Sequence, residues 1–451
     1  MSTRTRDMTV GSPGRLIFSF CLPIIAGNMF QQFYSLVDTL VVGRVEGVTA
    51  LAAVSSAGWL DWCVLSLAMG LAQGFAIEIA QRFGAGDEKG LRRAAGQSLL
   101  LAGTAVVVIE TLVQLLLRPV LNLLQTPAET FPLTEMYLRI LFGGLMLMMG
   151  FNLFSGFLRS VGDSRTPLIA MTTAALCNIG LDVLFVAVFR WGVAGVAIAT
   201  VLSQGISCTI CLIALIRLPV MRISRSDLRP DPACMRRLMA LGLPISLQNA
   251  TISIGGLVLQ GVVNGFGFIF MAGYSAASRL QGLVEVMGVS LSAAITAFAG
   301  QNMGANRLDR VKQGLRHSLL IGLAMSALIA AVIALFGRGI LSLFVEDDPA
   351  VVEQVLTFGH RFLLVMSAGL PGLYVLFVYR STLQGMGDTF IPMLSGVAEL
   401  VMRIGGALLL PLLIGEWGVY FAEISAWIGA AVLLVIGYYY RLHRIEAAKT
   451  N

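Results

Sequence analysis

Two aspartates inside apolar segments are the residues of this sequence best suited to chemistry. Asp38 lies in the segment Leu16–Val42, and Asp182 lies in the segment Thr166–Val188. Each segment is long enough for a helix that crosses a bilayer. A carboxylate in hydrocarbon costs at least ~2.5 kcal/mol, so such residues usually face a cavity and serve a function. We therefore expect Asp38 and Asp182 to belong to a functional site.

Other polar residues accompany these acids at helical spacing, which places them on shared helix faces. The first face carries Gln31, Tyr34, Ser35 and Asp38. The second carries Asn178 and Asp182, and a third, in the segment Val193–Ile216, carries Thr200, Ser203, Gln204 and Ser207. If these three helices pack together, two carboxylates, an amide and a hydroxyl converge.

Such a group suits a proton or a small alkali cation. Burial and a second nearby carboxylate favour the protonated acid. Alternatively, carboxylate, amide and hydroxyl oxygens form a hard oxygen cage for Na⁺ at Asp38 and Asp182. The simpler possibility is that Asn178 and Asp182 only hydrogen-bond to neighbouring helices. We expect no organic cofactor; the coupling ion is H⁺ or Na⁺.

Composition identifies a polytopic membrane protein. Of 451 residues 57% are hydrophobic and only 12% are charged, whereas soluble domains carry about 25% charged residues. The absence of a G-x-x-x-x-G-K-[ST] motif argues against ATP drive. Three unpaired His argue against a membrane metalloenzyme. The acidic segment 346–348 has no matching second cluster, so we interpret it as a solvated loop.

Hydropathy predicts an all-α membrane protein with twelve transmembrane helices. The apolar runs are Leu16–Val42, Leu51–Ala80, Ala94–Leu117, Leu133–Leu158, Thr166–Val188, Val193–Ile216, Leu238–Val263, Ala272–Ala299, Leu319–Phe344, Val355–Leu383, Ile391–Ile414 and Val419–Tyr440. Basic residues gather in the even-numbered connections and at the C-terminus. By the positive-inside rule, these connections and both termini face the cytoplasm. The net charge of +6 thus orients the spans and does not indicate binding of nucleic acid.

The chain repeats itself, which predicts two pseudo-symmetric six-helix bundles. Four motifs of the first half recur in the same order in the second half. One pair is Gln81-Arg-Phe-Gly-Ala-Gly86 and Gln301-Asn-Met-Gly-Ala-Asn306. We expect an N-terminal lobe 1–217, a basic cytoplasmic linker 218–235 that acts as a hinge, and a C-terminal lobe 236–451. In transporters with such repeats, substrate binds between the halves near the midplane.

The second half lacks counterparts of the two aspartates, because the repeat offset places Leu259 and Ala407 there. An ion site should therefore belong to the first lobe alone. In the second half, Glu399 and Arg403 stand at i and i+4, which favours an ion pair over a substrate contact. Asp61, in the second span, either attracts cations or is simply hydrated. Arg279, Glu285 and Glu423 are candidates for a polar network in the second half, but the sequence assigns them no role.

Neutral polar residues are candidates for substrate contact. In the first span these are Gln31 and Tyr34, which lie nearer the midplane than Asp38. The seventh span carries a comparable stripe at helical spacing, including Asn249 and Gln260. We expect these four residues to contact the substrate.

Several motifs together resemble the MATE (multidrug and toxic compound extrusion) family over nearly the whole chain. They include Gln31-Gln-Phe-Tyr-Ser-Leu-Val-Asp38, Asn178-Ile-Gly-Leu-Asp182 and Gly192-Val-Ala-Gly-Val-Ala-Ile-Ala-Thr200. The resemblance is to the DinF-like branch. The residues of that branch's first-lobe site correspond to Asp38, Asn178, Asp182 and Thr200 in this sequence. The acids that the NorM-like branch uses in the seventh and tenth spans are missing here.

The resemblance implies a MATE/MOP-type secondary antiporter, not an enzyme. It would export small organic cations or amphipathic drugs in exchange for H⁺ or Na⁺, by rocker-switch alternating access. We expect a monomer that contacts membrane lipid in the plasma (inner) membrane and binds no nucleic acid. The alternative is a lipid-linked oligosaccharide flippase of the same wider superfamily. Such a flippase should have a basic cavity, whereas the polar residues here are acidic or neutral.

Overall fold

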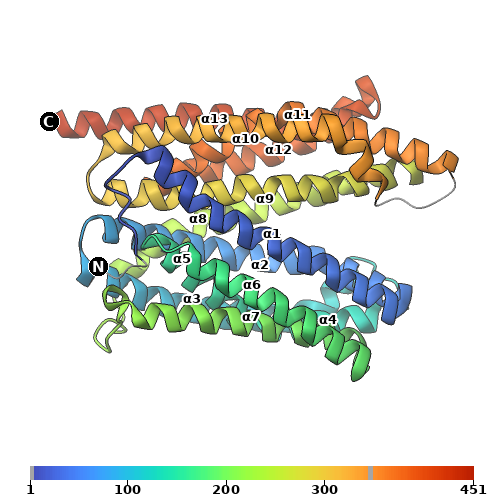
Figure 1. The fold of residues 1–451 in the computed structure, drawn as a ribbon, viewed down its shortest axis with the longest axis horizontal. Helices are drawn as coiled ribbons and strands as arrows, with labels where there is room; N and C mark the ends of the chain where they lie inside the picture. Colours follow the sequence, from blue (N-terminus) through green and yellow to red (C-terminus); the bar gives the residue numbers. More distant parts are fainter. Residues whose placement is uncertain (1–4, 344–348, 451) are drawn as a thin grey trace. The chain divides into compact units, whose positions relative to one another are not determined.

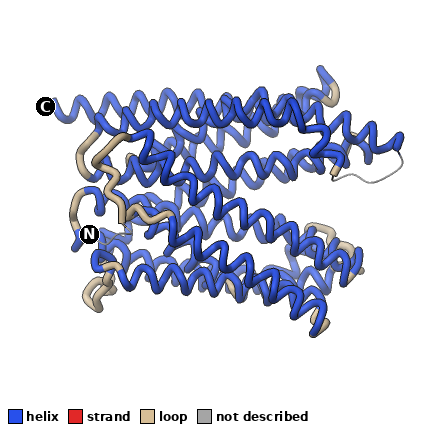
Figure 2. Tube along the Cα trace, viewed as in Figure 1, coloured by secondary structure: helices blue, strands red, loops and turns tan. Residues whose placement is uncertain are grey.

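The protein is described by a computed structural model that covers residues 5–343 and 349–450, and all regular structure in these residues is helical (Figure 2). The first half forms α1 Pro13–Val45, α2 Gly47–Gly84, α3 Glu88–Leu123, α4 Phe131–Gly143, α5 Leu145–Ser160, α6 Arg165–Asp182, the π-helix η1 Val183–Val188 and α7 Gly192–Arg217. The second half forms the 3-10 helix η2 Pro219–Met221, α8 Pro232–Asn264, α9 Phe268–Gly304, α10 Leu308–Ser342, α11 Pro349–Gly385, α12 Phe390–Ile414 and α13 Trp417–Thr450. The acidic segment 346–348 lies outside the described residues.

The expected twelve spans are confirmed. Within the described residues, eleven helices are long and apolar enough to cross a membrane, and the pair α4 and α5, bent by 47°, makes twelve when it is counted as one span. The bend falls at Gly144, where an added Cβ would lie 2.5 Å from a methyl carbon of Val201 on α7. Glycine therefore lets α7 approach the chain closely at the break, and sharp kinks commonly occur at such positions.

The chain folds as two compact units. Unit 1 contains the described residues before Gly11, Phe20–Ser246 and Gly300–Asn306; unit 2 contains Gly11–Ser19, Leu247–Ala299 and the described residues from Arg307 on. These limits differ from the expected division at 217 and 236, because the linker 218–235 and the start of α8 belong to unit 1. The division into two lobes and a hinge therefore stays a prediction.

Within unit 1, α2, α5, α6 and α7 run side by side, and α3 packs on α2 (Figure 1). The glycine Gly27 lets α1 pack closely against α6, since its Cβ would lie 3.2 Å from the sulfur of Met171. Within unit 2, α12 packs on α13, and α11 packs on α10 and α13. Close packing through small residues is typical of membrane helices.

Large apolar side chains remain exposed along several helices. Leu115 is 71% exposed, Leu335 is 76% exposed, and Leu412 and Leu413 are each 80% exposed. A soluble protein rarely exposes broad apolar surfaces, whereas a surface that faces lipid must be apolar. The chain is thus an integral membrane protein.

The repeated motif that begins at Gln81 and at Gln301 makes a reciprocal contact within unit 1. A Cβ on Gly84 would lie 1.9 Å from the carbonyl oxygen of Gln301. A Cβ on Gly304 would lie 1.8 Å from the carbonyl oxygen of Gln81. The two copies of the motif therefore contact each other through equivalent atoms, as an internal twofold repeat requires.

Candidate functional site

The first acid of the candidate site lies on α1. Asp38 is half-buried, and its Oδ1 atom is buried with no hydrogen-bond partner among the described residues. Tyr34 lies one turn earlier and is close enough to interact with Asp38. The side chain of Ser35 lies outside those described. Pro23 interrupts the hydrogen bonds of α1 four turns before Asp38.

The second acid ends α6. Asp182 is fully buried and Asn178 is 1% exposed. Both carboxylate oxygens of Asp182 and both polar atoms of the Asn178 amide lack a hydrogen-bond partner within the described part of the chain. Buried polar atoms are nearly always hydrogen-bonded, so several unpaired atoms in one place require an explanation.

A π-helical segment, Val183–Val188, follows Asp182 directly. π-Helical turns are rare and are often found at functional sites. The expectation of one continuous helix over Thr166–Val188 therefore needs correction at this point.

The two acids lie close together inside unit 1, and two tyrosines lie near them. The carboxylates of Asp38 and Asp182 lie close enough to interact electrostatically. Tyr137 of α4, 9% exposed, lies near both acids and near Asp61 of α2. Tyr34 lies near Asp61 as well. We call the group Tyr34, Asp38, Tyr137, Asn178 and Asp182 the acidic site.

Sequence reasoning overlooked Tyr137. The available signal was a tyrosine within the apolar run Leu133–Leu158, but which helix packs beside α1 and α6 is not readable from spacing. Gln204 of α7 was singled out as part of a polar stripe, and it lies near Tyr34. Asp61, for which the sequence leaves two roles open, lies beside the two tyrosines of the acidic site.

Thr200 is the expected site residue that the structure does not join to the acids. Its hydroxyl donates to the carbonyl oxygen of Val196 at 3.0 Å, within α7. Among the described residues, no contact between Thr200 and either aspartate is recorded, so its part in ion binding stays a prediction.

The expected substrate residues are divided between the units. Gln31 and Tyr34 belong to unit 1, where Gln31 is exposed and the two side chains are close. Asn249 and Gln260 belong to unit 2, where the Gln260 amide donates to Asn264 Oδ1 at 2.9 Å. Their joint role in substrate binding stays a prediction.

Unit 2 contains a buried set of opposite charges instead of an acidic site. Arg403 is 2.9 Å from Glu399 and 2.6 Å from Glu423, and Arg380 is 2.9 Å from Glu399. The predicted pair of Glu399 and Arg403 is thus confirmed. We call these four residues the charged network. Glu285 accepts a hydrogen bond from Gln281 at 3.3 Å, and Arg279 is exposed.

A bundle of apolar helices around internal carboxylates is compatible with a membrane transporter, and comparison with known proteins assigns that class. The family model MatE matches residues 23–184 and 244–409, so the chain belongs to the MatE family. The second match begins where the repeat predicted a second half.

Relatives of similar length support this assignment. The probable multidrug resistance protein YpnP of Bacillus subtilis is 29% identical, with 98% of each chain covered. A FAD transporter of Shewanella oneidensis is 26% identical, with 96% of this chain and 95% of the relative covered. The multidrug export protein MepA of Staphylococcus aureus is 25% identical, with 85% and 84% covered.

Solved structures share the fold. A crystal structure of MATE in complex with MaL6 gives a TM-score of 0.91 at 24% identity, covering 100% of both chains. An outward-facing multidrug resistance MATE family transporter of the MOP superfamily gives 0.90 at 24% identity, covering 99% of both. At this identity the likeness establishes the fold alone.

Proposed function

We propose that this protein is a secondary antiporter that exports organic cations and amphipathic drugs in exchange for H⁺ or Na⁺. The observation that carries the proposal is the acidic site. The carboxylates of half-buried Asp38 and fully buried Asp182 lie close together, while four polar atoms of Asp182 and Asn178 have no hydrogen-bond partner among the described residues. Two like charges in a desolvated site repel each other strongly, and a proton or a cation relieves that repulsion. The site therefore has a physical reason to take up one positive charge.

The exchange of ion for substrate follows from the unfavourable free energy of the two carboxylates when no ion is bound. An ion that binds Asp38 and Asp182 stabilises one conformation, and a ligand can shift an equilibrium only by its differential affinity. We propose that ion entry from outside repacks α1 against α6 and releases substrate, with Pro23 and Gly27 as the weak points of α1. The similarity to the probable multidrug resistance protein YpnP and the multidrug export protein MepA supports drugs as the exported class.

We further propose an orientation in the membrane from the distribution of basic residues. The basic connections and both termini face the cytoplasm, in the plasma (inner) membrane. The protein acts as a monomer, with Tyr34, Gln31, Asn249 and Gln260 in contact with substrate and Thr200 close to the ion.

The test is export of a fluorescent organic cation from proteoliposomes under a pure pH gradient and, separately, a pure Na⁺ gradient. The gradient that drives export identifies the ion. We expect Asp38→Asn and Asp182→Asn to reduce driven export to the rate without a gradient. Asp309→Asn, an exposed aspartate on α10, is the matched control and should export normally. Undiminished export by the Asp38 variant would refute the proposed mechanism.

A further inference from the structure

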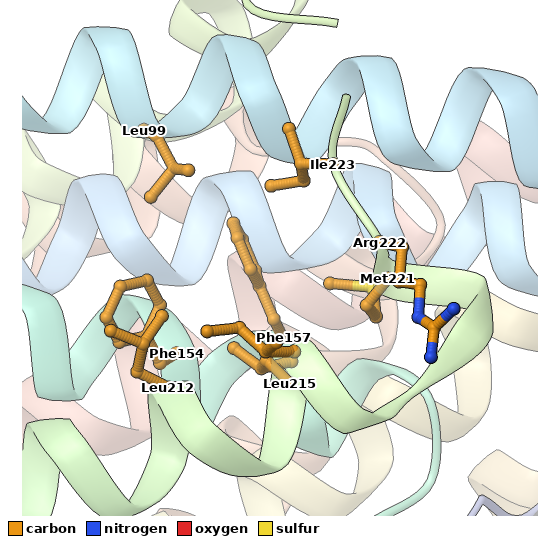
Figure 3. A pocket seen from close by; sticks show the side chains of 9 residues that line it. Leu99, Phe154, Phe157, Leu212, Leu215, Met221, Arg222 and Ile223 are labelled. Atoms are coloured by element: carbon orange, nitrogen blue, oxygen red, sulfur yellow. The ribbon is translucent and has the colours of Figure 1, made fainter. Parts of the chain in front are cut away.

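A pocket of about 430 Å³ opens in unit 1 at the end where α7 gives way to the linker (Figure 3). Its walls come from three helices and from the linker itself. The lining residues are Leu99 of α3, Phe154 and Phe157 of α5, Leu212, Leu215 and Ile216 of α7, and Met221, Arg222 and Ile223. The volume lies in the range of ligand sites, which are mostly apolar with a few polar groups.

One side chain gives this pocket its charge. Among the described residues that line it, Arg222 alone is ionic, and Figure 3 shows it on the linker beside apolar neighbours. Arg217 and Arg225 stand close by in sequence. No carboxylate of the described residues forms an ion pair with any of these three arginines. The mouth of an apolar pocket therefore carries positive charge that the protein does not neutralise.

The linker beyond Arg222 is tied to α3. The buried amide of Gln97 donates to the carbonyl oxygens of Asp227 and Arg229, each at 2.8 Å. Arg93 pairs with Asp231 at 2.6 Å. The Ser224 hydroxyl and amide donate to Asp227, which holds the pKa of that carboxyl below its ordinary value. Hydrogen bonds and an ion pair therefore connect the linker to α3 at Asp227, Arg229 and Asp231.

We propose that this pocket binds an anionic phospholipid of the leaflet that faces the basic end of the bundle. An acyl chain lies against Phe154, Phe157 and Leu212, and the phosphate pairs with Arg222. Basic pockets between membrane helices on the cytoplasmic side are suited to acidic headgroups. An organic cation is the wrong occupant, because Arg222 repels it.

Lipid binding is measured on purified protein without any transport step, so its outcome is independent of the proposed antiport. The protein is purified in detergent and titrated with phosphatidylglycerol or phosphatidylcholine, and the bound lipid is counted by native mass spectrometry. We expect phosphatidylglycerol to bind more tightly than phosphatidylcholine. Arg222→Gln should weaken phosphatidylglycerol binding about fivefold, as expected from about 1 kcal/mol per basic residue near a lipid surface.

Two variants separate the pocket from general surface charge. Arg225→Gln removes the same charge from the same linker but outside the pocket, and it should bind phosphatidylglycerol like the wild type. Leu212→Trp keeps the charge and fills the apolar wall at a half-exposed position, and it should weaken binding. The proposal is overturned if the two lipids bind equally, if Arg225→Gln loses as much as Arg222→Gln, or if Leu212→Trp has no effect.

Discussion

The carboxylates of the charged network in unit 2 are paired with arginines, whereas those of the acidic site in unit 1 are not. In the charged network, two arginines and two glutamates neutralise each other at distances of 2.6 to 2.9 Å. In the acidic site, no arginine or lysine of the described residues pairs with Asp38 or Asp182. A neutralised group has little to gain from an ion, whereas an acid pair without a cation can exchange one. The ion pairs of the charged network thus leave its carboxylates without an unpaired negative charge.

Removing Arg403 should destabilise unit 2 strongly, because Glu423 would lose its ion pair with Arg403 and buried Glu399 would keep only Arg380. We expect Arg403→Met to lower the free energy of unfolding by about 3–5 kcal/mol. Denaturant unfolding of the purified protein in detergent measures the loss. Arg279→Met, an exposed arginine on α9, is the control and should unfold like the wild type. Equal unfolding of both variants would show that the network contributes nothing.

At the scale of elements, small residues decide how closely helices approach. The reciprocal contact of Gly84 and Gly304 leaves no room for a Cβ, since the nearest atoms are backbone oxygens. The same logic applies at Gly144, where α4 and α5 bend beside α7. These positions are fixed by packing, although each glycine costs a helix some intrinsic stability.

Gly84→Ala should therefore destabilise the protein, despite the higher helix propensity of alanine. Overpacking of this kind costs about 1–3 kcal/mol, and thermal unfolding in detergent should register it. Gly103→Ala in α3 is a matched control, because its Cβ would meet no heavy atom within 4 Å. That variant should be as stable as the wild type or more so. The reverse order of stabilities would contradict the close contact.

The start of α3 depends on pH through its capping residue. Asp87 accepts a hydrogen bond from the Gly90 amide at 2.8 Å and pairs with Arg82 at 2.7 Å. The amide first, and then Arg82, hold the pKa of Asp87 below its ordinary value of 3.8. A lowered folded-state pKa means that this stabilisation is complete above 3.8 and is lost as the pH falls through the folded-state value.

Asp87→Ala should cost about 1 kcal/mol at pH 7, as is usual for loss of a helix cap. The difference from the wild type should shrink at pH 3, where the wild-type carboxyl approaches protonation. Unfolding at the two pH values measures this. Asp87→Asn keeps a capping side chain and should lose less than the alanine variant; a loss independent of pH would exclude the carboxylate as the cause.

In the whole molecule, both halves repeat the same helical architecture, but only the first half contains the acidic site. Two halves repeat the same motifs, yet the acidic site lies in unit 1 and the charged network in unit 2. A repeated scaffold requires the same spans in both copies, whereas the proposed antiport requires only one ion site.

The proposed orientation predicts which loops are reached from outside the cell. In a background without the six native cysteines, Ser226→Cys in the linker should react with an impermeant maleimide only after the cells are permeabilised. Glu129→Cys, between α3 and α4, should react in intact cells. Both positions are exposed in the structure. The opposite labelling pattern would invert the proposed topology.

The sequence by itself determined the twelve spans, the family and the pair of Glu399 and Arg403. The spans depend on the length of apolar runs, the family on short motifs, and the ion pair on i, i+4 spacing. All three are local properties of the chain. It also identified Asp38 and Asp182, because an acid in hydrocarbon is conspicuous wherever it stands. Only the tertiary structure decided which side chains surround them. Tyr137, the π-helix after Asp182 and the fastened linker all depend on which helices are neighbours, and neighbours are chosen by packing between residues far apart in the sequence.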